Sequence, residues 1–191
     1  MSSLPKIMLI GDSIRRSYQP LVTDLLHGRA EVVGPTENCQ FSEYTLARLD
    51  DWLKELGKPD IVHWNNGLHD VGYNPNRAPV QYSLDTYLDN LKLIITKLRK
   101  IDAKIIWATT TPVHPKRQFV TMKWSWRNAD IDRYNMAARK LMKAEDIRVN
   151  DLHKIVVSKP DISLTDDMIH LSKMGVEYCA KAVVKAIEVV M

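Results

Sequence analysis

A serine near the start of the chain and a histidine near its end are residue types that catalyse acyl transfer. Gly11-Asp12-Ser13 directly follows the apolar run Ile7 to Ile10, so the sequence predicts that Ser13 is presented at the end of a strand. Asp167 and His170 come just before the last predicted helix. A serine hydroxyl is a weak nucleophile until a base removes its proton, and that base needs a group that fixes its tautomer. The three residues therefore indicate a Ser-His-Asp acyl-transfer site.

The spacing within the second motif suits this role. His170 follows Asp167 by three positions (i, i+3), which lets the carboxylate turn back onto Nδ1 of the imidazole while Nε2 faces Ser13. Neither motif alone is specific. Gly-Asp-Ser is also typical of a strand-to-helix turn with a capping residue, and Asp-x-x-His alone is even weaker evidence for an active site. The interpretation therefore depends on a fold that brings the two ends of the chain together.

The pattern of apolar residues predicts such a fold. Five β-branched, apolar runs are typical of buried strands. They cover Lys6 to Ile10, Glu31 to Val33, Asp60 to Trp64, Lys104 to Thr109 and Arg148 to Asp151. Helical periodicity separates these runs, most clearly over 84–98, 131–142 and 176–190, with shorter helices expected around Pro20 to Leu26 and Leu46 to Leu56. Pro20 is expected near a first-turn position.

Strands that alternate with helices imply right-handed crossovers and a mainly parallel sheet. We therefore expect an α/β fold, a three-layer α/β/α sandwich with a five-stranded sheet, in a single domain over residues 1–191. Functional groups gather beyond the carboxyl ends of strands in such sheets, which would bring Ser13 and His170 together. The long irregular stretch from Thr110 to Asn128 follows a strand end and is expected to be functional or mobile.

Composition narrows the class of protein. The net charge is +4, from 27 basic and 23 acidic residues that are scattered along the chain, so no nucleic-acid partner is expected. No stretch approaches the roughly 20 apolar residues of a membrane-spanning helix. Cys39 and Cys179 are far apart and form no CxxC pair, which fits a reducing compartment. A cytoplasmic location is expected, and an exported form with a removed leader stays open. The oligomeric state is not predicted.

A third motif makes the pattern specific. Asn65-Asn66-Gly67-Leu68-His69-Asp70 follows the middle predicted strand. The ordered set of Gly-Asp-Ser, Gly-x-His-Asp and Asp-x-x-His resembles the SGNH hydrolases, also called the GDSL family. The resemblance runs from Gly11 to Gly175, and each motif stands at the expected place relative to the predicted strands. It implies a flavodoxin-like fold and a serine esterase without a metal or organic cofactor.

The resemblance also implies roles for individual residues. Ser13 matches the nucleophile, His170 the general base and Asp167 the residue that orients the base. The oxyanion hole of the family uses the nucleophile's N–H, a glycine N–H after the second strand and an asparagine side chain. This chain departs from the family at two of these three donors.

At the asparagine position the chain has His69. A neutral imidazole donates from one nitrogen only, so its use depends on the tautomer, and Asn66 or Asn65 could supply the amide instead. The glycine position falls on Cys39 by counting back from the following helix, although a shift could move it as far as Glu43. We expect Ser13, Cys39 and His69 to form the oxyanion hole.

Aromatic and basic residues near strand ends predict the substrate. Indole faces stack on sugar rings, and arginine binds carboxylates or hydroxyl clusters. These residues therefore favour a carbohydrate ester as substrate, either a small molecule or an oligosaccharide that carries an acetyl group. Equally, the tryptophans could fill the core and the arginines could be solvated. Trp64 and Trp124 are further candidates for the rim of the substrate pocket. The candidate substrate-binding residues are Asp12, Arg16, Asn66, Trp126 and Arg127.

Other functions remain as alternatives. A lipid esterase or thioesterase of the same family would accept long acyl chains. A non-catalytic carbohydrate-binding protein could share the scaffold, because a fold does not guarantee turnover. A metal site at His63, His69, Asp70 and His114 has no supporting ligand spacing, and no metal is expected.

Overall fold

The computed structural model describes residues 4–116 and 125–191. Five parallel strands form one sheet, as the sequence predicted, and the order of the strands is β2-β1-β3-β4-β5. The strands are β1 (Lys6–Ile10), β2 (Glu31–Val33), β3 (Ile61–Trp64), β4 (Lys104–Ala108) and β5 (Arg148–Asn150). The apolar side chains of the inner strands β1 and β3 are buried on both faces of the sheet, which is why these runs do not alternate with polar residues, and those of the edge strands β2 and β5 are partly buried.

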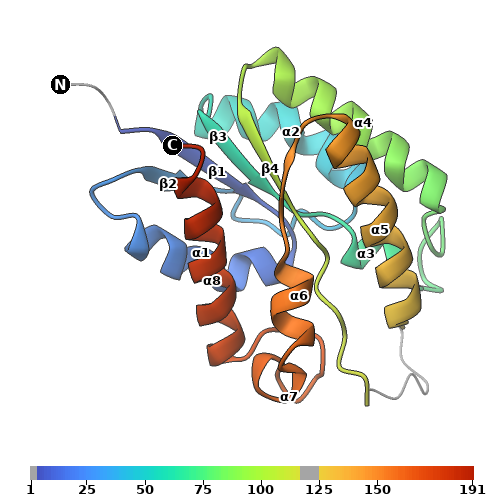
Figure 1. Ribbon diagram of the computed structural model, residues 1–191. Coiled ribbons are helices and arrows are strands. Elements are labelled where there is room, and N and C mark those ends of the chain that lie inside the picture. The colour runs from blue at the N-terminus through green and yellow to red at the C-terminus, as the bar shows by residue number, and fades with distance from the viewer. Residues whose placement is uncertain (1–3, 117–124) are drawn as a thin grey trace.

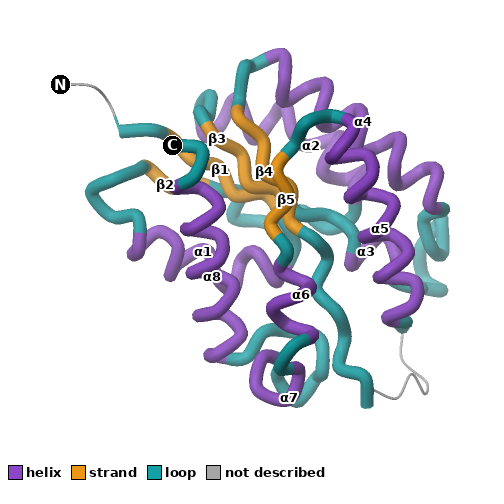
Figure 2. The backbone as a smooth tube through the Cα atoms, in the orientation of Figure 1, coloured by secondary structure: helices purple, strands orange, loops and turns teal. Residues whose placement is uncertain are grey.

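Helices cover both faces of this sheet (Figures 1 and 2). The helices α1 (Ser13–Leu25) and α8 (Lys173–Glu188) pack together on one face. The other face carries α2 (Ser42–Leu56), α4 (Leu84–Lys100) and α5 (Asn128–Ala144). Three short helices lie in the connections: α3 (Leu68–Val71), α6 (Leu152–Val157) and α7 (Pro160–Ser163). The architecture is the expected three-layer α/β/α sandwich.

One helix start differs from the expectation. The first helix begins at Ser13, and Pro20 lies inside it rather than in its first turn. The start is fixed by Asp12, whose side chain accepts a hydrogen bond from the N–H of Ile14, and by burial of one apolar face that includes Tyr18 and Val22. Pro20 is exposed, and its ring removes only one internal hydrogen bond. Helix capping and burial therefore outweigh the preference of proline for a first turn.

Connections from distant parts of the chain meet at the carboxyl ends of the strands. There β1 leads into α1, β2 leads into the loop of residues 34–41, and β3 leads into α3. The loop between α7 and α8 reaches the same edge, because His170 lies against Ser13. The described ranges contain no helix long and apolar enough to cross a membrane. Cys39 and Cys179 are both buried and unbridged.

Candidate active site

Ser13 lies at the point where the first strand turns into the first helix. It is the first residue of α1 and is half buried, and Asp12 caps the helix. The first N–H groups of a helix have no partner within the helix, and the helix dipole places partial positive charge there. The backbone N–H of Ser13 is therefore available beside the Ser13 hydroxyl, in a field that favours negative charge.

His170 faces this serine from the loop before α8. Its Nε2 lies 2.9 Å from Oγ of Ser13, and its Nδ1 lies 2.5 Å from Oδ2 of Asp167. The turn between the two residues is tight, because Met168 has a positive φ of 64°. Next to it, Ser172 caps α8 by accepting a hydrogen bond from the N–H of Gly175. The structure thus brings Ser13, His170 and Asp167 into one hydrogen-bonded chain.

The second oxygen of Asp167 holds the turn in shape. Oδ1 accepts hydrogen bonds from the backbone N–H of Ile169 and of His170, each at 2.9 Å, and from the Thr165 hydroxyl at 2.8 Å. Partial burial acts to raise the pKa of Asp167, but the hydrogen bonds from His170, Ile169 and Thr165 outweigh it. The pKa of Asp167 is therefore far below its usual range, so the carboxylate is charged whenever His170 accepts a proton.

A cavity of about 320 Å³ opens beside the serine and the histidine. Leu68, Trp126 and Ile169 give it apolar walls, while His69 and Asn38 add polar groups. Trp126 is fixed in place because its Nε1 donates to the carbonyl of Leu68 at 2.8 Å. The cavity therefore has room for a small group whose reacting carbon meets Ser13.

His69 enters this cavity from α3. Burial lowers the pKa of the imidazole, the Asp12 carboxylate acts to raise it, and Arg77 and His170 act to lower it further. The net shift is downward, so the ring is neutral near pH 7 and donates from one nitrogen. Arg77 also binds the backbone carbonyl of His69 through Nη2 at 3.0 Å. His69 is thus held in the wall of the cavity that Ser13 and His170 also line.

Asp70, the next residue, anchors α3 to α2. Both its oxygens accept from the N–H of Ser42, at 2.9 and 3.1 Å, and Oδ1 also accepts from the Ser42 hydroxyl at 2.5 Å. Asp70 is fully buried, and burial raises its pKa to about 6 despite these hydrogen bonds. The carboxyl therefore positions the segment that carries His69.

The expectation for Cys39 does not fit the observed geometry. Its backbone N–H donates to the carbonyl of Gly11 at 3.2 Å, so this group is already occupied. Its side chain is fully buried and does not line the cavity. Glu43, the far limit of the expected range, lies within α2. Asn38, which the sequence analysis did not single out, lines the cavity instead.

A protein-family model matches most of the chain. The model for the GDSL-like lipase/acylhydrolase family matches residues 9–178. The chain belongs to this family. It is accordingly an ester hydrolase with the fold of the GDSL esterases. No curated protein matches the chain by sequence.

Solved structures of esterases and of a lipase/acylhydrolase have the same fold. An acetyl xylan esterase superimposes with a TM-score of 0.80 at 21% identity, covering 95% of this chain and 99% of that protein. A lipase/acylhydrolase from Enterococcus faecalis gives 0.76 at 22% identity, with 97% and 96% covered. An acetylxylan esterase from Geobacillus stearothermophilus gives 0.76 at 19% identity, with 97% and 95% covered.

Two predicted substrate-binding residues of this GDSL-like hydrolase have structural roles instead. Asp12 is buried and caps α1. The side chain of Asn66 is buried and fully used, since Oδ1 accepts from the indole of Trp64 and Nδ2 donates to the carbonyl of Gln40 and the hydroxyl of Thr45. The Asn66 amide is therefore not available to a ligand, and neither Asn66 nor Asp12 lines the cavity beside Ser13.

The other predicted substrate residues are spread over three hollows. Trp126 lines the cavity beside Ser13. Arg127 lines a separate cavity of about 300 Å³ with Tyr73 and Asp130, and Arg16 is exposed beside a third hollow on α1. Trp64 belongs to the core, and Trp124 lies outside the described residues.

The four residues weighed as metal ligands do not form one cluster. His63 is buried and lies 3.1 Å from the amide of Asn150, and burial lowers its pKa to about 4. His114 lies 3.0 Å from Asp161. Within residues 4–116 and 125–191, no three His, Cys, Asp or Glu side chains gather as metal ligands.

Proposed function

We propose that this hydrolase is a serine esterase that removes a small acyl group, acetyl, from a carbohydrate ester through an acyl-enzyme. The observation that carries the proposal is the hydrogen-bonded chain from Ser13 through His170 to Asp167 beside a small cavity. The serine and the base are within the reach that nucleophile activation requires.

The geometry supports the following sequence of steps. Oγ of Ser13 attacks the ester carbonyl while Nε2 of His170 takes its proton. The charged Asp167 stabilises the imidazolium and holds its tautomer. The N–H of Ser13 and the ring of His69 face the oxygen that becomes negative. His170 then protonates the leaving alcohol, and afterwards activates the water that releases the acid.

The size of the cavity favours a short acyl group. A volume of about 320 Å³, shared between the acyl group and part of the alcohol, suits acetate better than a long chain. Apolar walls from Leu68 and Ile169 fit a methyl group, and the indole of Trp126 offers a face for a sugar ring. Two similarly folded proteins named as acetyl xylan esterases support the same substrate class.

The test compares acyl lengths and two serine variants. We expect turnover of 4-nitrophenyl acetate to exceed that of the octanoate, and release of acetate from acetylated xylo-oligosaccharides. Ser13→Ala should lower kcat by at least about 10³-fold and abolish labelling by a fluorophosphonate. Ser17→Ala is the matched control, because Ser17 lies exposed on the same helix.

Each arm of the test has an outcome that opposes the proposal. A preference for the octanoate would oppose the acetyl assignment and favour a lipid esterase. Sugar binding without hydrolysis, unaffected by Ser13→Ala, would oppose catalysis itself.

A further inference from the structure

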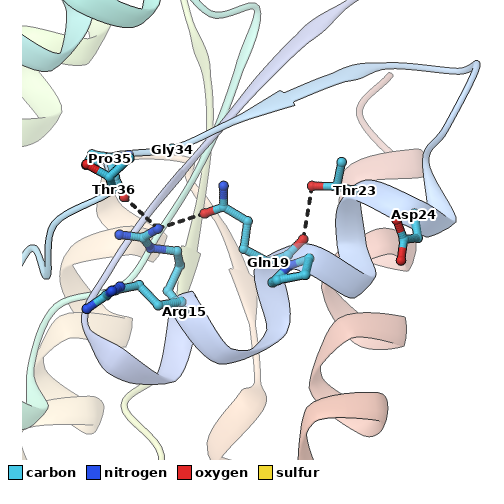
Figure 3. Close-up of a pocket in the computed structure, with 9 residues that line it drawn as sticks. Arg15, Gln19, Thr23, Asp24, Gly34, Pro35 and Thr36 are labelled. Atoms are coloured by element: carbon cyan, nitrogen blue, oxygen red, sulfur yellow. Dashed lines mark hydrogen bonds between the residues drawn. The ribbon is translucent and has the colours of Figure 1, made fainter.

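Arg15 is a buried cation two residues after the candidate nucleophile. Only 2% of its surface is exposed, and none of its hydrogen-bond partners is a carboxylate. Instead its guanidinium binds the backbone carbonyls of Gly11, Pro35 and Glu37. Figure 3 shows the side chain reaching from α1 across to the segment at Gly34 and Pro35, with Gln19 holding it from the next turn.

These contacts join two segments that are distant in sequence. Nε and Nη2 donate to the carbonyl of Gly11, at 3.3 and 3.1 Å, on the nucleophile side. Nη1 donates to the carbonyl of Pro35 at 2.9 Å, and Nη2 to that of Glu37 at 3.0 Å, on the loop after β2. Arg15 therefore fixes the distance between the serine turn and this loop.

Two glycines make the junction possible. A side chain at Gly11 would come within 2.7 Å of Cβ of Arg15, so only glycine lets Arg15 fold back over the serine turn. A side chain at Gly34 would come within 2.6 Å of the Leu9 carbonyl and of Oε1 of Gln19. The loop can therefore run close enough to α1 for its carbonyls to reach the guanidinium.

The hydrogen bond to Glu37 orients a particular peptide plane. In a trans peptide the C=O and the following N–H point in opposite directions. Because the Glu37 carbonyl points at Arg15, the N–H of Asn38 points away from Arg15. This N–H makes no hydrogen bond with any residue in the described ranges, and Asn38 lines the cavity that holds Ser13 and His170. The next amide, that of Cys39, is bound to Gly11 instead.

We propose that Arg15 is a positioning residue that holds the backbone N–H of Asn38 toward the cavity, as the second donor to the oxyanion. The inference rests on the proposed serine esterase function and replaces Cys39 as the expected donor. Arginine suits this role because its planar fork binds several carbonyls at once and keeps its charge when buried. Lysine at this position could reach only part of these carbonyls.

The first test uses charge-conserving and charge-removing variants. Arg15→Lys and Arg15→Ala should each lower kcat for 4-nitrophenyl acetate by about 10- to 1000-fold, since a missing oxyanion donor costs about 10²–10³ in rate. KM should change by less than about threefold, because the donor acts on the transition state. Millimolar guanidinium should restore part of the activity of Arg15→Ala, which urea and sodium chloride should not. Arg29→Met, which removes an exposed arginine, is the control for charge.

The second test uses the wild-type protein, so it does not depend on a variant that folds. After Ser13 is labelled with a phosphonate, the amide resonance of Asn38 should move downfield and exchange more slowly, whereas that of Cys39 should not move. An unchanged Asn38 amide, or wild-type kcat in folded Arg15→Lys, would overturn the inference. Failure of the wild type to turn over ester or to accept the label would instead oppose the esterase function.

Discussion

The two sides of the candidate site are built in different ways. The nucleophile side consists of residues 11–15, the loop of residues 34–41 with the following Ser42, and residues 65–70. Buried contacts between these distant segments hold it, chiefly those of Arg15 and Asp70. The histidine side, residues 165–170, is held mostly by hydrogen bonds within six residues, with one long-range hydrogen bond from the N–H of His114 to the carbonyl of Met168 at 2.9 Å. It is also open, since the side chains of His170 and Asp167 are 47% and 49% exposed.

This difference follows from the chemistry proposed for each side. An oxyanion donor must be aimed to within tenths of an ångström of an atom that is charged only briefly, and buried long-range contacts give that precision. A general base must exchange protons with a leaving alcohol and with incoming water, so it gains from exposure. Local hydrogen bonds to Asp167 are enough to hold its tautomer.

The largest effect is expected from the histidine side. Asp167→Asn replaces the charged carboxylate by an amide that favours the wrong imidazole tautomer, so kcat should fall by about 10³- to 10⁴-fold. The measurement is kcat for 4-nitrophenyl acetate between pH 6 and 9, alongside the thermal midpoint. Asp166→Asn, at the exposed neighbouring residue, serves as the control. A loss of less than tenfold would show that the local turn holds His170 without the charge.

On the nucleophile side, His69→Ala should lower kcat by about 10²- to 10³-fold, because one oxyanion donor is lost. His69→Asn supplies an amide that donates at any pH, and it should recover most of that loss. The imidazole of His69 becomes protonated at acidic pH in the wild type, whereas the amide in His69→Asn keeps the same protonation state. An unchanged kcat in His69→Ala would remove His69 from the oxyanion hole.

The sequence predicted the fold well and indicated that Ser13, Asp167 and His170 could lie together, because both inferences depend on local patterns. Five apolar runs became the five strands, with bounds that differ by one residue at most. Ser13 stands at a strand end, and the spacing of Asp167 and His170 suits a turn, so simple rules apply to both.

The nucleophile side was predicted less well, for a physical reason. No local pattern indicates that Arg15 is buried or that it binds the carbonyls of Pro35 and Glu37, because those contacts arise from the packing of α1 against the loop. Counting residues back from a helix gave Cys39 as a donor, but the orientation of a peptide plane depends on its hydrogen bonds, and these direct the Cys39 N–H to Gly11. The amides of Asn65 and Asn66 are likewise occupied by partners that no local pattern indicates, since they donate to the carbonyls of Ala108 and Gln40.

The smallest expected effect separates the two sides by pH. Asp70 on the buried side has a pKa raised to about 6, above its value in the unfolded chain, so the folded state binds more protons between about pH 4 and 6. The free energy of unfolding should therefore rise by about 1 kcal/mol from this group as pH falls from 7 to 5. Asp167 has a lowered pKa, so its contribution is constant above about pH 4 and is lost only in stronger acid.

Urea unfolding at pH 5, 6 and 7 should show that wild type and Asp70→Asn differ increasingly in favour of wild type as pH falls, while the difference from Asp167→Asn stays constant. Parallel pH curves for all three proteins would mean that burial does not distinguish the two carboxylates, and the contrast between the two sides would then be confined to their hydrogen-bond geometry.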